Sequence, residues 1–368
     1  GLMEGKKTPL YDQHIKLGGK IVNYAGWLLP VQYEGLVPEH NAVRNAAGIF
    51  DVSHMGTIDI TGKDAISFLD YLMTNDLSKV KDKQVMYTFM CYPHGGVVDD
   101  LLVYKYHDEK FFLVVNAANL EKDLEWINRL KDKFNVEIKD TSQDTCILAL
   151  QGPSAQKILQ KLVDIDLSEI KFFYFRDGIK INDVDVMISR TGYTGEDGFE
   201  IYVNNKDVVK IWEDLLQAGR EEGLKPAGLG SRDTLRFEAA LPLYGNEISQ
   251  EISPLEGGFK FFVKLKKGSD FIGKEALIKQ WESGLKKTLV GFEMIDRGIP
   301  REGYEVYKDG NKIGHVTTGY MSPTLKKSIG NALILSKEAE LDNEIEIIIR
   351  KRPVKAKIID KNFLRNNK

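Results

Sequence analysis

The sequence is poor in the residues that disulfides, zinc sites and membrane spans require. Its 368 residues include only two cysteines, Cys91 and Cys146, so neither a disulfide scaffold nor a zinc ribbon is expected. None of its six histidines has the spacing of a zinc ligand, and we therefore predict no metal. No apolar run approaches the roughly 18 residues of a membrane helix, so no membrane partner is predicted. The polar start, Gly1–Tyr11, lacks the apolar stretch of a secretory signal, and a cytoplasmic location is expected.

The net charge and the absence of certain motifs argue against further classes of protein. Lysine and arginine number 51 against 54 acidic residues, a net charge of −3, which argues against a nucleic-acid binder. Gly228 and Gly230 lack the third glycine of a dinucleotide fingerprint and no Walker A loop occurs, so no nucleotide cofactor is predicted. No GxSxG elbow occurs either, so serine hydrolase chemistry has no local support. Carboxylates, aromatic rings and glycine-rich loops remain as the means of binding a ligand.

Helical and strand periodicities alternate irregularly over most of the chain, which is typical of an α+β fold rather than a doubly wound sheet. The first of four expected helices runs from Pro38 towards Ala47, with Val37, Val43 and Ala47 pointing inward. The other helices are expected at 66–73, 120–130 and 208–215, and strands at 86–91, 97–106, 111–115, 145–150, 184–189 and 199–203.

The end of the chain has a different pattern. Six short strand-like segments between Leu289 and Ile359 are separated by turn signals such as Asp309-Gly310, which predicts a compact β-barrel. We therefore expect two regions, 1–280 and a barrel domain at 287–368. The last 19 residues hold eight basic residues and one acid, which fits either a solvated edge strand or a rim that contacts anions.

Two adjacent acids, Asp99 and Asp100, follow the turn at Gly95-Gly96 and begin an apolar strand. Strand alternation sends them to opposite faces, so at least one is expected to point inward. A buried carboxylate is costly without a partner, and it suits general acid–base or charge-stabilising chemistry. Taken alone, the pattern is more typical of a carboxylate that caps a turn or pairs with an arginine.

The segment Ser189–Glu200 combines three glycines with Tyr193 and the carboxylate of Glu200. The glycines free the backbone for close approach to a ligand. Glu200 opens a strand, where its two oxygens could accept parallel N–H bonds from an amidine-like edge such as that of a 2-aminopyrimidinone ring. The alternative is a plain glycine-rich hairpin with a solvated acid.

A third segment, Pro226–Glu238, has the pattern of a loop followed by a short helix, with Arg232, Arg236 and Glu238 spaced for local ion pairing. Arg232 is predicted to face a ligand, whereas Arg236 and Glu238 fit a structural role. The cluster Lys171–Arg176 adds aromatic rings, most of them core, of which one or two could stack on a flat heterocycle. A pterin with a glutamate tail fits this set of groups, and so does a flavin or a purine.

At these segments the chain resembles the aminomethyltransferases, the T-protein family of the glycine cleavage system. The matches follow one another from about residue 8 almost to the end of the chain. They are Tyr24–Trp27, Phe50–Gly56, Met73–Asp76, Gly95–Leu101, Val115–Asn119, Leu150–Pro153, Ser189–Glu200, Ala227–Asp233 and Ser322–Leu325.

The resemblance implies a three-domain cloverleaf in which two interleaved, ferredoxin-like α+β lobes and a C-terminal β-barrel surround a central tetrahydrofolate pocket. It also implies the reaction. The lipoylated H-protein would deliver an aminomethyl group on its dihydrolipoyl arm, and the carbon would pass to tetrahydrofolate as a co-substrate. The products would be 5,10-methylenetetrahydrofolate, ammonia and the dihydrolipoyl carrier.

Site residues also follow from the resemblance. Asp100 matches the family's key aspartate, beside the folate nitrogens N5 and N10, and its implied role is to orient and electrostatically support them and an iminium-like intermediate. Glu200 matches the residue that grips the pterin amino edge. The other folate-binding positions implied are Tyr87, Asn116, Phe172, Phe173, Tyr193, Arg232 and Arg365. The chain departs from the family at Leu241, which replaces an aromatic residue, and in the ending Asn362–Arg365.

Three alternatives remain for the function. A folate-dependent demethylase would act on another amine or sulfonium donor. A non-catalytic folate-binding accessory protein would carry a Lys-Gly-Cys signature, which this sequence lacks. A flavin-linked amine oxidase with this fold as its C-terminal half would need a dinucleotide fingerprint and a longer chain.

Overall fold

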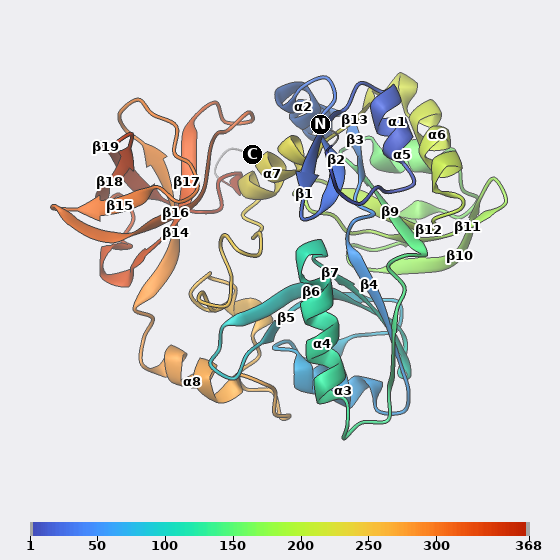
Figure 1. The fold of residues 1–368 in the computed structure, drawn as a ribbon, viewed down its shortest axis with the longest axis horizontal. Helices are drawn as coiled ribbons and strands as arrows, with labels where there is room; N and C mark the ends of the chain where they lie inside the picture. The colour runs from blue at the N-terminus through green and yellow to red at the C-terminus, as the bar shows by residue number, and fades with distance from the viewer. Residues whose placement is uncertain (1–2, 366–368) are drawn as a thin grey trace. The chain divides into compact units, whose positions relative to one another are not determined.

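The computed structural model describes residues 3–365 and divides the chain into two compact units. The first consists of Gly1–Phe68, Ser78–Tyr87 and Leu101–Leu235, and the second of Leu69–Leu77, Thr88–Asp100 and Arg236–Lys368, as far as they are described. Each unit is therefore assembled from segments that are far apart in the sequence (Figure 1).

A six-stranded sheet forms the centre of the first unit. Its strand order is β10-β11-β12-β9-β3-β13, antiparallel throughout except for the parallel pair β13 and β3. The strands are β3 (Ala47–Asp51), β9 (Thr145–Gln151), β10 (Phe175–Ile181), β11 (Val184–Ser189), β12 (Gly198–Asn204) and β13 (Leu224–Pro226).

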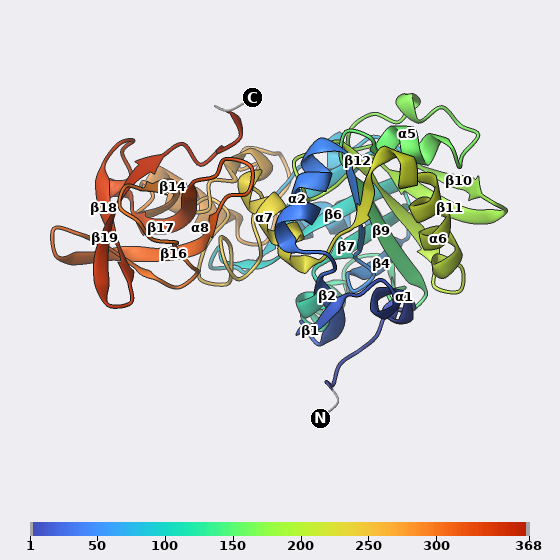
Figure 2. The same ribbon diagram turned by 90° about the horizontal axis from the view of Figure 1, so that it is seen from above.

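The two faces of this sheet are covered differently. Helices α5 (Ala155–Gln160) and α6 (Val208–Ala218) are labelled beside this sheet in Figures 1 and 2. They contribute to an aliphatic core on one face of the sheet, and Trp212 is fully buried in that core. The period-two alternation of β12 sends Phe199 and Ile201 into this core. It sends Glu200 and Tyr202 to the opposite face, which is where the candidate site lies.

A second sheet has the order β5-β6-β7-β4-β8. Its strands are β4 (Gly56–Thr61), β5 (Val85–Cys91), β6 (Val97–His107), β7 (Lys110–Val115) and β8 (Glu137–Asp140). Tyr104 and Phe112 of this sheet share one buried cluster with Phe175 and Tyr202 of the first sheet. The two sheets therefore pack face to face through aromatic rings within the first unit.

Short 3-10 helices aside, the remaining elements of residues 3–240 are a hairpin and five α-helices. They are α1 (Tyr11–Lys16), β1 (Lys20–Tyr24), β2 (Trp27–Gln32), α2 (Leu36–Asn45), α3 (Ala65–Leu72), α4 (Leu120–Leu130) and α7 (Leu229–Glu238). The first expected helix is thus confirmed, but two of its details are wrong. Val37 is 51% exposed, and Ala47 belongs to the buried strand β3 instead of the helix, which ends at Asn45.

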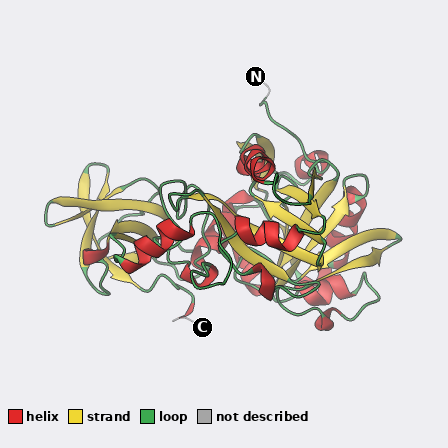
Figure 3. Ribbon diagram, turned by 90° about the horizontal axis from the view of Figure 1, so that it is seen from below, coloured by secondary structure: helices red, strands yellow, loops and turns green. Residues whose placement is uncertain are grey.

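A closed barrel with the order β14-β17-β16-β15-β18-β19 follows helix α8 (Lys274–Glu282) in the second unit (Figures 1 and 3). Its strands are β14 (Lys287–Met294), β15 (Glu305–Lys308), β16 (Asn311–Met321), β17 (Ser328–Leu335), β18 (Glu344–Ile349) and β19 (Arg352–Ile359). Asp309 and Gly310 form the hairpin between β15 and β16, both with positive φ. The expected barrel is confirmed.

Barrel closure bears on one of the two interpretations of the basic C-terminal residues, the solvated edge strand. Strand β19 pairs with β18 on one side and with β14 on the other. Residues 356–359 are thus paired with β14, and β19 belongs to the closed barrel instead of standing at the edge of a sheet. The edge-strand interpretation is therefore wrong, and the rim that contacts anions stays a prediction. Among the helices of residues 3–365, none is long and apolar enough to cross a membrane.

Candidate functional site

Glu200 occupies the polar end of the first sheet. It stands opposite Ser189 on β11 and Ala149 on β9, and its side chain is half-buried. The hydroxyl of Thr191 donates a hydrogen bond of 2.6 Å to Oε1. Burial raises the pKa of Glu200, while the Thr191 bond and the charge of Arg232 oppose that rise. The strand therefore presents a carboxylate that is desolvated on one side and still able to take a ligand.

Arg232 and Tyr193 lie together in the first unit. Arg232 is in the first turn of α7, and its guanidinium carbon is 4.8 Å from the centre of the Tyr193 ring. This is cation–π geometry, which fixes both side chains. Because the charge of Arg232 also acts on Glu200, three of the predicted site residues share one neighbourhood.

His54 is a neighbour of this group for which the sequence predicted no role. It is 4% exposed, and within residues 3–365 its Nδ1 atom has no hydrogen-bond partner. Burial, followed by the charge of Arg232, lowers its pKa to about 4. The ring is therefore neutral at pH 7, and it packs edge-on against Tyr24 at 5.7 Å. The only available sequence signal was its place in the motif Phe50–Gly56.

The glycine-rich loop between β11 and β12 is fastened by Gln151, which sequence reasoning also missed. Its Nε2 atom donates to the carbonyls of Thr191 (3.0 Å) and Phe199 (3.3 Å), and its Oε1 accepts from the Thr194 hydroxyl at 2.8 Å. A Cβ atom at Gly192 would lie 2.0 Å from Oε1 of Gln151. The glycine at this position therefore makes room for Gln151, a different role from the expected approach to a ligand.

Arginines hold the same loop from the outside. Arg44 donates to the carbonyl of Thr194 and pairs with Glu196 at 2.9 Å. Arg190 forms a forked pair with Asp197, with N–O distances of 3.0 and 2.9 Å. The loop is thus rigid, and its other acidic side chains have structural partners.

Asp99 and Asp100 occupy the start of β6 in the second unit. Asp99 is fully buried and Asp100 is half-buried, which agrees with the expected alternation. The Asp99 carboxylate accepts a hydrogen bond from the Asp100 amide at 3.0 Å. The turn before them closes through a bond from the amide of Tyr92 to the carbonyl of Gly96 (2.8 Å), with Gly95 at φ +95°.

The other predicted residues have varied surroundings. Tyr87 on β5 and Asn116 after β7 are half-buried, and Arg365 is exposed in the second unit. Phe172 is 74% exposed and its ring lies 4.7 Å from that of Phe173. Phe173 has a φ of +61° and is held by backbone bonds to Arg190 and Val85. The pair therefore offers one fixed and one accessible ring.

Arg236 and Glu238 have the structural role expected of them, with partners that local spacing did not indicate. Arg236 is fully buried and pairs at 2.7 Å with Glu247, a residue beyond the end of its own helix. Glu238 accepts hydrogen bonds from the hydroxyls of Ser322 (2.6 Å) and Thr324 (2.5 Å). The expected local pairing overlooked the fully buried position of Arg236, which requires a buried carboxylate beside it.

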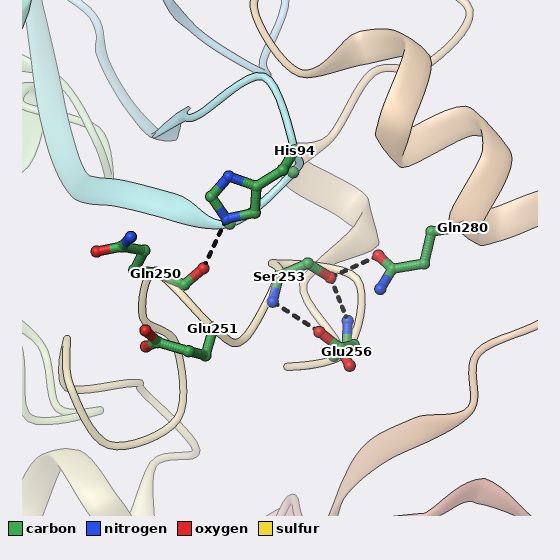
Figure 4. Close-up of a pocket in the computed structure, with 8 residues that line it drawn as sticks. His94, Gln250, Glu251, Ser253, Glu256 and Gln280 are labelled. Carbon is green, nitrogen blue, oxygen red and sulfur yellow. Dashed lines mark hydrogen bonds between the residues drawn. The ribbon is translucent and has the colours of Figure 1, made fainter.

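A pocket of about 360 Å³ lies in the second unit beside the turn at Gly95-Gly96 (Figure 4). His94 contacts the carbonyl of Gln250 at 2.9 Å, and the Ser253 hydroxyl donates to Gln280 at 2.6 Å. The amide of Ser253 donates to Glu256 at 2.9 Å. These polar groups form hydrogen bonds with one another, so the residues that line the pocket also stabilise its shape.

The two cysteines are buried and free. Burial raises the pKa of the Cys91 thiol well above its ordinary value and that of Cys146 to about 11. Neither is an activated nucleophile. Within residues 3–365, no group of three or more His, Cys, Asp or Glu side chains is arranged to hold a metal ion.

The fold and these side chains define a class: an α+β protein with a C-terminal β-barrel and a half-buried carboxylate flanked by an arginine and aromatic rings, suited to a flat, nitrogen-rich ligand. Two family models match the chain. The GCVT N-terminal domain covers residues 10–267, and the glycine cleavage T-protein C-terminal barrel domain covers residues 287–364. The chain belongs to the glycine cleavage T-protein family.

Full-length relatives support the same assignment. The chain is 65% identical to an aminomethyltransferase of Thermoanaerobacter pseudethanolicus and 60% identical to one of Alkaliphilus metalliredigens, over 98% of both chains in each case. The crystal structure of the glycine cleavage system aminomethyltransferase T from Bartonella henselae superposes with a TM-score of 0.91 at 30% identity, covering 97% of this chain and 98% of that one. The family resemblance, the fold class and the aminomethyltransferase activity expected from the sequence are confirmed.

Proposed function

We propose that Glu200 is the residue with which this aminomethyltransferase grips the pterin ring of tetrahydrofolate. The observation that carries the proposal is the environment of its carboxylate. One oxygen is held by Thr191, and the charge of Arg232 offsets part of the desolvation that raises the pKa of the group. A 2-amino-4-oxo pterin presents two adjacent N–H donors along one edge, and a carboxylate accepts such a pair in parallel.

Tyr193, Phe172 and Phe173 are proposed to bound the flat faces of the pterin. Tyr193 is fixed by Arg232 and Phe173 by its backbone, while the exposed ring of Phe172 is free to cover a ligand. Aromatic walls suit a planar heterocycle because they supply contact area at little entropic cost. Tyr87 and Asn116 are proposed as polar neighbours of the ring, and Arg365 as a cation for the glutamate tail.

Asp100 is proposed as the residue that acts at the reacting atoms. The carbon arrives as an aminomethyl group and leaves ammonia behind, so positive charge develops on the carbon and nitrogen atoms during the transfer. A fixed carboxylate beside that charge stabilises the transition state more than the ground state. The half-buried position of Asp100, with its neighbour Asp99 buried behind it, provides the low-dielectric setting in which such a charge is most effective.

The partner in this proposal is the lipoylated H-protein, which would deliver the aminomethyl group. The decisive assay supplies aminomethylated H-protein and tetrahydrofolate, and measures both ammonia and 5,10-methylenetetrahydrofolate. Equal amounts of the two products are expected. Product formation no faster than in an enzyme-free control would overturn the proposal, and folate binding without turnover would instead identify an accessory protein.

A second arm of the assay separates the demethylase alternative. A demethylase would form methylenetetrahydrofolate from a methylated amine or a sulfonium donor in the absence of H-protein. The expected result is that no such donor replaces aminomethylated H-protein.

A further inference from the structure

Four buried hydroxyls form a continuous chain that ends on Glu200. Tyr202 contacts Tyr104 (O–O distance 2.5 Å), Tyr104 contacts Ser189 (3.0 Å), and Ser189 contacts Thr191 (2.7 Å), which donates to Oε1 of Glu200 (2.6 Å). None of the four residues is more than 5% exposed. The chain crosses between the two sheets of the first unit, because Tyr104 belongs to β6 and the others to β11, β12 and the loop that joins them.

The ionised carboxylate of Glu200 determines which hydroxyl of this chain donates to which. An ionised carboxylate only accepts hydrogen bonds, so Thr191 donates to Glu200 and must accept from Ser189. Ser189 in turn accepts from Tyr104, and Tyr104 from Tyr202. All four O–H bonds then point towards Glu200, and every donor is used.

The four hydroxyls are also linked beside this chain. Tyr202 is hydrogen-bonded to Ser189 as well as to Tyr104, and Tyr104 to Thr191 as well as to Ser189. Thr191 is the member that donates to Glu200, and because its bond lowers the pKa of this carboxyl, it favours the ionised form of Glu200.

We propose that Thr191 and Tyr104 are positioning residues that hold Glu200 ionised, with Oε1 occupied and Oε2 presented to the N–H edge of the ligand. Within the described residues, Oε1 accepts from Thr191 and Oε2 has no protein donor. This inference rests on the proposed role of Glu200, and it adds that the affinity for the folate depends on pH through this carboxylate.

The charged and titratable groups that face Glu200 are few. Arg232 on α7 favours its ionised form, and burial disfavours it. Tyr104 on β6 and Tyr202 on β12 have pKa values raised by burial, so both stay neutral over the range of interest. Because the pKa of Glu200 is raised, folate affinity is expected to fall as the pH drops through mildly acidic values, where the carboxylate takes up a proton.

The test measures the dissociation constant of tetrahydrofolate for the intact enzyme, from about pH 5 to about pH 8. Thr191→Val removes the donor to Oε1 and keeps the side-chain shape, and a bond to a charged group corresponds to a midpoint shift of roughly one pH unit. The affinity is therefore expected to approach a roughly tenfold loss at pH values below the midpoint, at the acidic end of the range, and to be nearly unchanged near pH 8. Thr191→Ser keeps the hydroxyl and is expected to restore the wild-type profile.

Two tyrosine variants grade the effect along the chain. Tyr104→Phe removes the second link and is expected to shift the midpoint in the same direction by less than Thr191→Val, and Tyr202→Phe by less again. A merely structural role would lower the melting temperature and weaken binding equally at every pH. Equal weakening at the two ends of this pH range in Thr191→Val would overturn the inference.

Glu200→Gln separates this inference from the proposed function. If Glu200 binds the pterin, this variant weakens binding and removes the acidic limb of the pH profile. If it changes neither, the proposed role of Glu200 itself fails. If Glu200→Gln weakens binding while Thr191→Val leaves the midpoint in place, only the hydroxyl chain's role is refuted.

Discussion

Replacing Arg236 by methionine tests how the second unit tolerates a buried ion pair. The Arg236 side chain is fully buried, donates to Glu247 at 2.7 Å and to the Thr318 hydroxyl at 3.0 Å, and also contacts the carbonyl of Leu241. The Thr318 hydroxyl donates to the second oxygen of Glu247 at 2.6 Å, so the three side chains form a closed triad.

Removal of one partner leaves the other charge buried. Arg236→Met preserves most of the volume but leaves the carboxylate of Glu247, which is 2% exposed, without its counter-ion. The expected loss in the free energy of unfolding is about 3–5 kcal/mol. Glu247→Gln removes the negative charge and leaves Arg236 without its counter-ion, but the Gln oxygen still accepts a hydrogen bond from Arg236, so a smaller loss than for Arg236→Met is expected.

Urea unfolding of the intact chain measures these values, and a double-mutant cycle isolates the pair. The double variant Arg236→Met/Glu247→Gln buries no charge at this position, so its loss should be smaller than the sum of the two single losses. Arg176→Met is the matched control because Arg176 pairs with Glu169 at 3.4 Å at the surface, where a loss of no more than about 1 kcal/mol is expected. If Arg236→Met cost no more than Arg176→Met, the reasoning from burial would be refuted.

Three further predictions concern the site and the pH dependence of stability. Asp100→Asn should lower turnover by roughly a hundredfold or more while folate binding is retained, and lost binding would identify Asp100 as a ligand anchor instead. Glu200→Ala should raise the dissociation constant of tetrahydrofolate by at least about tenfold, and an unchanged constant would contradict the assignment. For Asp51, burial acts to raise the pKa, but the hydrogen bond and charge of His14 at 2.8 Å outweigh it and the net pKa is lowered. Its contribution to stability is therefore complete above the ordinary carboxyl pKa and is lost as the pH falls below it. Unfolding free energies measured against pH should show this acid limb in the wild type and less of it in Asp51→Asn.

The sequence predicted secondary structure best where periodicity was strong. Trp212 and its helical neighbours, and the strands on either side of Asp309-Gly310, lie where the pattern placed them. Local pattern failed at Val37, which has the spacing of a core residue but is exposed, because burial depends on which other segments reach that side of the helix. For the same reason the pattern could not identify Glu247 as the partner of Arg236.

In the candidate site, too, some residues could be predicted from the sequence and others could not. Glu200, Tyr193 and Arg232 were found because they stand in segments dense in glycine, rings and charge. The residues that hold these side chains in place could not be predicted from the sequence, because they lie on strands that are distant in the sequence. Tyr104 meets Ser189 across 85 positions, a contact set by the packing of two sheets and not by any local spacing.

Gln151 changes what the glycines of the loop signify. A glycine-rich loop beside a carboxylate suggests a flexible backbone that closes on a ligand. Here a Cβ at Gly198 would lie 2.5 Å from the carbonyl of Leu150 and 2.7 Å from Nε2 of Gln151, so the residue is small because the strand and this amide approach so closely. The same amide bonds the carbonyl of Thr191, which carries the hydroxyl that holds Glu200. The glycines therefore allow the close approach of Gln151, and the hydrogen bonds of Gln151 make the loop rigid. The carboxylate of Glu200 is thus oriented before a ligand binds, which lowers the entropic cost of binding.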